Sequence, residues 1–167
     1  MNSCISYLVK KSRSYRRFDE QRCIPRETII RLVDIARLYP SVRKRQPLWY
    51  MLPTDPGQTA QIRSCLLFAL DLPDWGRTVK GELPVAYITI ATEDECTPFT
   101  AYDIGIVAQT MMLAAAEQGF GGCMIVSIKK EELRSVLSLP DRFEIHLVLW
   151  HSGIRQKRWF RTYWEGG

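Results

Sequence analysis

Residues 101–128, AYDIGIVAQTMMLAAAEQGFGGCMIVSI, carry the pattern of the longest helix in the chain and decide how the rest is interpreted. From Ala101 to Gln118 apolar residues occupy almost every face of a helix, which is typical of a helix buried in a fold or at a subunit interface. Gly119 is placed to end this helix in a left-handed conformation. Residues 123–128 are then expected to form a short strand. The stretch therefore predicts a buried helix that leads through a glycine-rich turn into a sheet.

Helical and strand patterns alternate on both sides of this stretch. Before it, helices are expected at 3–11, from Pro25 to Tyr39 and at 58–70, with strands at 48–52 and 84–91. The apolar run 84–91 is nearly continuous, so it is expected to be buried on both faces of a sheet. After the stretch come a predicted helix at 130–139 and a strand at 143–150. The chain begins with helices and has no internal repeat, which indicates an α+β or three-layer domain around one central sheet.

The composition is typical of one globular domain rather than of a membrane, secreted or metal-binding protein. Of 167 residues, 46% are apolar and 25% charged. No run approaches the roughly 18 consecutive apolar residues of a membrane span, and the apolar stretch from Ile5 to Val9 is too short for a signal peptide. The five cysteines are scattered without a Cys-x-x-Cys pair, so we expect neither a disulfide framework nor a metal site. A reducing cytoplasm is the expected setting.

The positive charge is concentrated at the C-terminal end. The net charge is +5, and residues 151–167 carry +3 of it. We therefore divide the chain into a domain, residues 1–150, and an atypical basic tail, residues 151–167. Basic residues beside Trp159 and Phe160 leave open a contact with nucleic acid or a membrane surface. Because four charges without periodicity are more typical of a disordered chain end, we expect neither partner.

Three stretches are candidates for binding a ligand, and each has an ordinary structural alternative. Arg13-Ser14-Tyr15-Arg16-Arg17 offers guanidinium groups and a hydroxyl that suit a phosphate, or it forms a solvated surface. The polar loop from Pro40 to Pro47 is restrained by its prolines, so it either hydrogen-bonds a planar heterocycle or serves as a structural turn. Gly119-Phe120-Gly121-Gly122 permits close approach of the backbone to a ligand, but it matches neither a Walker loop nor a dinucleotide fingerprint.

No catalytic dyad is evident in the sequence. His146 lies in a predicted strand beside apolar residues, which favours a structural role over that of a base. An enzyme without an evident acid, base or metal most simply lets a cofactor carry the chemistry.

Taken in order, these stretches resemble the nitroreductase family of FMN-dependent oxidoreductases. Residues 13–18 look like the family's opening Arg-Ser-x-Arg-x-Phe, and residues 40–47 look like its Pro-Ser-x-x-Asn-x-Gln-Pro loop. Residues 103–109 and 117–125 resemble the family's Asp-x-Gly-x-x-x-Gln helix and the Gly-x-Gly-Gly turn that follows it. The resemblance covers the chain from about residue 5 to Leu149.

The resemblance implies a three-layer α+β homodimer with a mixed or antiparallel central sheet flanked by helices, and two FMN sites at the subunit interface. It assigns the phosphate to Arg13, Ser14 and Arg16, and the flavin ring to Pro40, Ser41, Lys44 and Gln46 of one subunit and to the backbone at Met124, Ile125, Val126 and Ser127 of the other. NADH or NADPH would deliver a hydride to flavin N5, and a nitroaromatic, quinone or similar small molecule would accept the electrons. The resemblance assigns no catalytic side chain.

Several positions depart from the family pattern. Ser12 replaces the first Arg of the phosphate pair, Lys44 replaces the Asn that contacts the ring, and Val126 fills a position often held by Gly or Glu. These departures favour an alternative, a family-fold protein that binds flavin weakly or not at all. The residues after Leu149 do not match the family's C-terminal segment. Codons that encode Trp150 to Phe160 can, when read in another frame, encode the family's usual ending. We therefore hypothesise a frameshift near Leu149.

Overall fold

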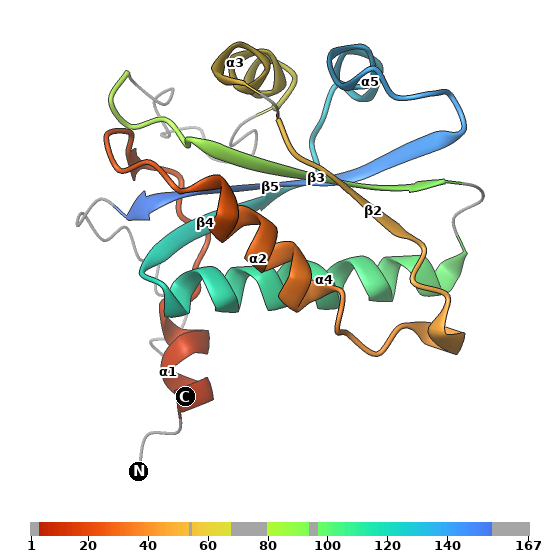
Figure 1. Cartoon of the computed structure of the whole chain (residues 1–167), viewed down its shortest axis with the longest axis horizontal. Coiled ribbons are helices and arrows are strands. Elements are labelled where there is room, and N and C mark those ends of the chain that lie inside the picture. Colours follow the sequence, from red (N-terminus) through yellow and green to blue (C-terminus); the bar gives the residue numbers. More distant parts are fainter. Residues whose placement is uncertain (1–3, 54, 68–79, 94–96, 155–167) are drawn as a thin grey trace, which may run out of the picture.

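The central sheet consists of five strands, and all of their pairings are antiparallel (Figure 1). The computed structural model describes residues 4–53, 55–67, 80–93 and 97–154. Strand β5 (Phe143–Ile154) lies between β3 (Ala86–Glu93) and β4 (Phe120–Ile125), and β2 (Leu48–Met51) lies on the far side of β3. The short β1 (Phe18–Asp19) pairs with the end of β5. Every residue of β3 before Glu93 is buried, which confirms the prediction from its continuous apolar pattern.

Helices cover both faces of this sheet. On one face lie α4 (Pro98–Glu117) and α2 (Arg26–Ala36), which pack against each other, and on the other lie α3 (Pro56–Ser64) and α5 (Lys130–Leu137) (Figure 1). The N-terminal α1 (Cys4–Lys11) projects beyond the α4 face. The predicted three-layer α+β architecture is confirmed.

Helix α4 is the longest element, and its buried residues include Val107, Met111 and Ala115. It begins at Pro98, three residues before the predicted start, because Thr97 and Thr100 form a reciprocal capping box and Pro98 needs no amide partner in the first turn. By length and composition alone it could span a membrane, but half of it is buried inside the protein and it packs as a core helix.

Several predicted boundaries were wrong because tertiary pairing overrides local preference. Strand β4 starts at Phe120 instead of residue 123, because residues 120–122 pair with β5, Phe120 opposite Gly153. For the same reason β5 continues beyond residue 150 to Ile154, while residues 155–167 lie outside the described chain. The helix predicted at 58–70 ends at Ser64, and residues 68–70 are likewise outside the described part. Gly119 does adopt the left-handed conformation expected of it, with φ at 79°.

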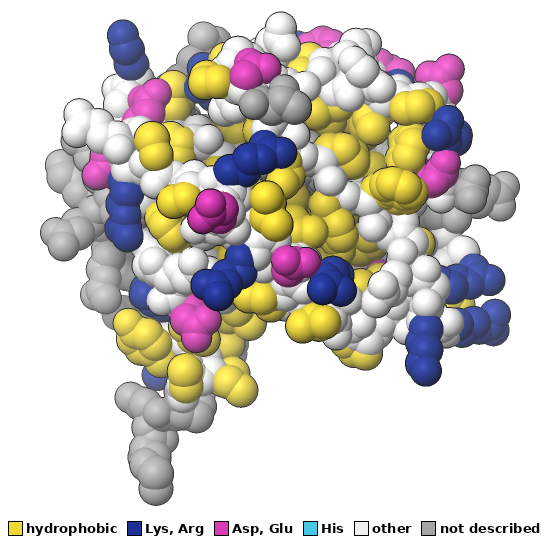
Figure 2. Space-filling model, in the orientation of Figure 1, with side chains coloured by type: hydrophobic (Ala, Val, Ile, Leu, Met, Phe, Trp, Pro, Cys, Tyr) yellow, Lys and Arg dark blue, Asp and Glu magenta, His cyan; other side chains and the backbone are white. Residues whose placement is uncertain are grey.

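A single turn of 3-10 helix, η1 (Val42–Lys44), connects α2 to β2 at the end of the molecule where α4 begins. Figure 2 shows that Lys and Arg side chains gather over this corner. The three consecutive cations Arg43, Lys44 and Arg45 are all exposed. The loop therefore forms a locally positive corner beside the N-terminal end of α4.

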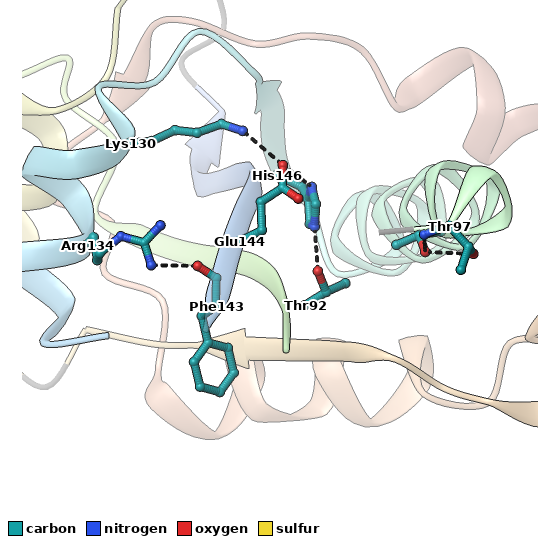
Figure 3. A network of polar contacts seen from close by, with 8 residues as sticks. Thr92, Thr97, Lys130, Arg134, Phe143, Glu144 and His146 are labelled. Carbon is teal, nitrogen blue, oxygen red and sulfur yellow. Dashed lines mark hydrogen bonds and ion pairs between the residues drawn. The ribbon is translucent and has the colours of Figure 1, made fainter. Parts of the chain in front are cut away.

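His146 supports the sheet, as the sequence suggested. It is the extra residue of a β-bulge and has no partner on β3. Its Nε2 atom lies 2.8 Å from Thr92 Oγ1, and its Nδ1 atom lies 3.8 Å from a Glu144 carboxylate oxygen that Lys130 also contacts (Figure 3). Burial lowers the pKa of His146, Glu144 opposes this shift, and Lys130 adds to it. The neutral imidazole is therefore the form that the fold accommodates.

This network predicts an acid sensitivity that depends on one residue. As the pH falls through about 6.5, the unfolded chain protonates His146 more readily than the folded chain, so the free energy of unfolding decreases. We expect His146→Gln, which stays neutral, to lose less stability than the wild type between about pH 7.5 and about pH 5.5. Urea unfolding at both pH values measures this, and parallel losses in the two proteins would contradict it.

Candidate functional site

The hydroxyl of Ser41 attaches the loop between α2 and β2 to helix α4. Ser41 Oγ donates a hydrogen bond to Asp103 Oδ2 at 3.0 Å, and it accepts one from the backbone amide of Gln46, also at 3.0 Å. The Gln46 side chain donates to the carbonyl oxygen of Arg37 at the end of α2. Four sequence-predicted residues, Pro40, Ser41, Lys44 and Gln46, therefore belong to one loop fixed at both of its ends. Asp103 was part of a quoted motif, but the sequence analysis did not assign it to the site.

Three residues of this loop have left-handed backbone conformations without being glycine. The φ angles are 55° at Arg43, 56° at Lys44 and 44° at Gln46. Each such residue costs roughly 1–2 kcal/mol relative to a right-handed conformation. Strained backbone of this kind persists only where the surrounding contacts impose it, and the hydrogen bonds of Ser41 and Gln46 do so here.

A buried polar cluster lies beneath the loop. Asp103 is 2% exposed, and its Oδ1 atom has no hydrogen-bond partner among the described residues; the same holds for the hydroxyls of Tyr39 and Tyr50. Burial raises the pKa of Tyr39, Ser41 partly offsets this, and the negative charge of Asp103 raises it further. Burial also raises the pKa of Tyr50. Both phenols therefore stay protonated beside the negative charge of Asp103.

A cavity of about 420 Å³ opens between this loop and the first turns of α4. Arg43 and Arg45 line it on the loop side, and Pro98, Phe99 and Asp103 line it on the helix side. Its volume falls within the range of ordinary small-molecule sites.

The second group of predicted residues lies beside the start of β4. Ser14 forms a parallel bridge with Gly122, and the amide of Tyr15 donates to the Gly122 carbonyl oxygen at 2.8 Å. Arg13 is exposed and Arg16 half-buried, and within the described chain neither forms an ion pair. The neighbouring Arg17 pairs instead with Glu82 at 3.1 Å, so its role is structural. The backbone of residues 13–16 therefore lies against the glycine-rich turn and pairs with it at Gly122.

The four predicted residues after this turn follow β4 to its end. Met124 and Ile125 belong to the strand, whereas Val126 and Ser127 follow it. The Val126 side chain is 69% exposed, and the Ser127 carbonyl oxygen accepts a hydrogen bond from the amide of Leu67. The chain thus leaves the sheet at a fixed position with an apolar side chain facing outward.

One chain does not bring the two groups of predicted residues together. The Ser41 loop, residues 40–47, is attached near the beginning of α4, at Asp103. The Arg13 segment, residues 13–16, adjoins Gly122 through Ser14, and Gly122 follows the end of that helix. The helix between Asp103 and Glu117 is about 21 Å long at 1.5 Å per residue. A ligand that contacts both the Arg13 segment and the Ser41 loop therefore needs parts of two chains or spans the length of α4.

The strain at Lys44 predicts a stabilising substitution. Asn tolerates positive φ better than Lys, so Lys44→Asn is expected to increase the free energy of unfolding by about 0.5–1 kcal/mol. Arg45→Asn is the matched control, because Arg45 has a right-handed conformation and should gain nothing. Chemical denaturation measures both variants. A Lys44→Asn protein no more stable than the control would show that the loop is not strained at this position.

Comparison with known proteins identifies the fold family. The nitroreductase family model matches residues 9–71 and 82–152. A nitroreductase family protein from Streptococcus pneumoniae TIGR4 is 17% identical, with a TM-score of 0.77 over 96% of each chain. An FMN-dependent nitroreductase from Clostridium difficile R20291 is 19% identical, with a TM-score of 0.73 over 93% of this chain and 91% of its own.

An FMN- and NADPH-dependent nitroreductase from Sphigopyxis sp. strain HMH is 16% identical, with a TM-score of 0.76 over 99% of this chain and all of its own. No match was found among curated protein sequences. At these identities the solved structures establish the fold, and the family model, which covers most of the sequence, establishes descent. The chain belongs to the nitroreductase family.

Proposed function

We propose that this protein is a cytoplasmic, homodimeric FMN-dependent oxidoreductase that transfers a hydride from NADH or NADPH to a small acceptor such as a nitroaromatic or a quinone. The observation that carries the proposal is that Arg13 and Arg16, in a chain of this family, form no ion pair with another described residue and flank Ser14, whose backbone bridges to Gly122. Two structural neighbours are named as FMN-dependent nitroreductases, one of them also as NADPH-dependent, which supports the same cofactors here.

The residues present fit the phosphate of FMN. Two guanidinium groups and the exposed hydroxyl of Ser14 can donate several charge-assisted hydrogen bonds to one phosphate. Neither Arg13 nor Arg16 would have to break an ion pair with another described residue to do so. These donors support a phosphate site at the end of the sheet where β4 begins.

Two-fold pairing of α4 would complete the site. Phe99, Tyr102 and Ile106 form an apolar stripe on this helix, and they are 49%, 64% and 41% exposed. If two copies of α4 lie antiparallel over their full length on the side of this stripe, the beginning of one α4 lies near the end of the other. The Ser41 loop of the partner subunit would then approach Arg13 and Met124 of the first.

The flavin ring would thus lie between the backbone at Met124, Ile125, Val126 and Ser127 of one subunit and the Pro40, Ser41, Lys44 and Gln46 loop of the other. Bound FMN supplies the hydride-transfer chemistry, for which the protein needs no acid or base side chain. The protein binds and orients the ring. Lys44 is a cationic donor at the position of the usual Asn, so it can donate to a carbonyl oxygen of the ring but cannot accept.

The alternative is a family-fold dimer that has lost its flavin. Lys44 and the exposed Val126 are the features that favour it, because one removes an acceptor from the ring site and the other adds bulk beside it. The visible spectrum of the purified protein separates the two functions. A yellow protein that bleaches anaerobically with NADH or NADPH supports the enzyme, and a colourless protein that does not bind added FMN would rule it out.

The phosphate contacts predict the size of a binding defect. Arg13→Ala and Arg16→Ala should each weaken FMN binding by about 1.5–3 kcal/mol, which corresponds to roughly ten- to 150-fold in Kd. Quenching of flavin fluorescence on titration measures the affinity. Arg31→Ala, which removes an exposed Arg from α2, is the matched control and should bind FMN like the wild type. Unchanged affinity in both arginine variants would place the phosphate elsewhere.

A further inference from the structure

Arg22 lies at the end of the sheet where the Arg13 segment meets β4. It belongs to the turn that follows β1, in which its amide donates to the carbonyl oxygen of Asp19 at 3.1 Å. Strand β1 pairs with the end of β5, and the beginning of β4 pairs with that same end (Figure 1). The side chain of Arg22 therefore starts within reach of the glycine-rich turn, residues 119–122.

The end of β5 determines the path of this side chain. Gly153 of β5 is buried, and a β-carbon built on it would come within 2.7 Å of Arg22 Cβ and within 2.9 Å of Arg22 Cγ. Side-chain carbons do not approach each other so closely, so the stem of Arg22 fits here because residue 153 is glycine. The stem thus lies directly across the end of the strand.

The guanidinium group of Arg22 lies over the glycine-rich turn. Its Cζ atom is 5.1 Å from the centre of the Phe120 ring, which is a cation–π distance. One terminal nitrogen lies 3.5 Å from the position of a β-carbon built on Gly119. Gly122, the backbone partner of Ser14, follows Phe120 by two residues, or about 7 Å of strand. The charge is therefore held beside the Arg13 segment.

No described acid neutralises this guanidinium group. Arg22 forms no ion pair within the part of the chain that the structure describes. The two acids nearest to it in sequence, Asp19 and Glu20, accept hydrogen bonds from backbone amides instead. Contact with a ring face uses none of the N–H groups of an arginine, and Arg22 is exposed. Its donors are therefore available to a ligand.

A phosphate at this end of the sheet needs more positive charge than the Arg13 segment supplies. A phosphate monoester carries about −1.5 to −2 charges at neutral pH, which Arg13 and Arg16 together only balance. The glycine-rich turn also follows the C-terminal end of α4, whose partial negative charge opposes the binding of an anion. Arg22 offsets the helix end and adds a third guanidinium group beside the same turn.

We propose that Arg22 is a third phosphate-binding residue, which binds the phosphate group of FMN together with the Arg13 segment. The assignment rests on the proposed function, because FMN is the ligand that brings the phosphate. Phe120 and Gly153 are positioning residues: the ring holds the guanidinium group, and the glycine leaves room for the stem. The site then selects FMN over riboflavin, which has the same ring and ribityl chain but no phosphate.

The difference between FMN and riboflavin isolates this contact. Quenching of flavin fluorescence on titration with the protein measures both affinities. In Arg22→Gln we expect FMN to bind about tenfold more weakly and riboflavin to bind as in the wild type, because only FMN carries the group that Arg22 contacts. The affinity for FMN should also depend less steeply on salt than in the wild type. Arg31→Gln on α2 is the matched control and should change neither flavin's affinity nor the salt dependence.

Gly153→Ala displaces the same cation without removing its charge. The added methyl group would collide with the stem of Arg22, so the preference for FMN over riboflavin should decrease here as well. A double variant with Gly153→Ala and Arg22→Gln should prefer FMN no less than Arg22→Gln alone, because both changes remove one contact. A wild-type preference in Gly153→Ala would show that Gly153 does not position Arg22.

Two results with Arg22→Gln would overturn the proposal while the protein still binds FMN. Equal weakening of FMN and riboflavin would show that Arg22 only supports the fold, and unchanged affinities with an unchanged salt dependence would show that it does not contact the phosphate. A wild-type protein that takes up no FMN would overturn the proposed function, and this role of Arg22 with it.

Discussion

A rigid helix of 20 residues separates the two halves of the candidate site, and the rest of the account depends on that separation. Near one end of α4, Asp103 holds the Ser41 loop; beyond the other, Gly122 holds the Arg13 segment. Val107, Met111 and Ala115 fix the helix against the sheet, so the two halves cannot approach one another within a chain. Because the opposite face of α4 exposes an apolar stripe, the proposed two-fold dimer would bury that stripe and combine the two halves of the site from different chains.

The hydrogen bond from Ser41 to Asp103 connects fold, strain and binding. It attaches a loop with three positive φ angles to the core helix, and the second carboxylate oxygen of Asp103 stays buried. A bond to an ionised acceptor contributes roughly 1.5–3 kcal/mol, enough to offset the strain of one or two such residues. The backbone of the loop is therefore preorganised before any ligand arrives.

The sequence predicted elements and motifs better than it predicted their spatial relations. The sequence correctly predicted the buried helix α4, the buried strand β3, the left-handed Gly119 and the structural role of His146, because each follows from local chemistry. The start of β4 at Phe120 was missed because it depends on pairing with β5, and the role of Asp103 was missed because its partner Ser41 lies 62 residues away. Nothing in the order of the motifs indicates that the Arg13 segment and the Ser41 loop lie at opposite ends of one helix.

Complementation between defective subunits tests the central claim most directly. One chain carries Arg13→Ala and Arg16→Ala, the other Ser41→Ala and Gln46→Ala, and heterodimers are isolated through two different affinity tags. If each site combines the Arg13 segment of one chain with the Ser41 loop of the other, one site per heterodimer is intact. The heterodimer should then bind about half as much FMN per chain as the wild type, at concentrations where both mutant homodimers stay empty. A heterodimer as empty as its parents would contradict a site shared between subunits.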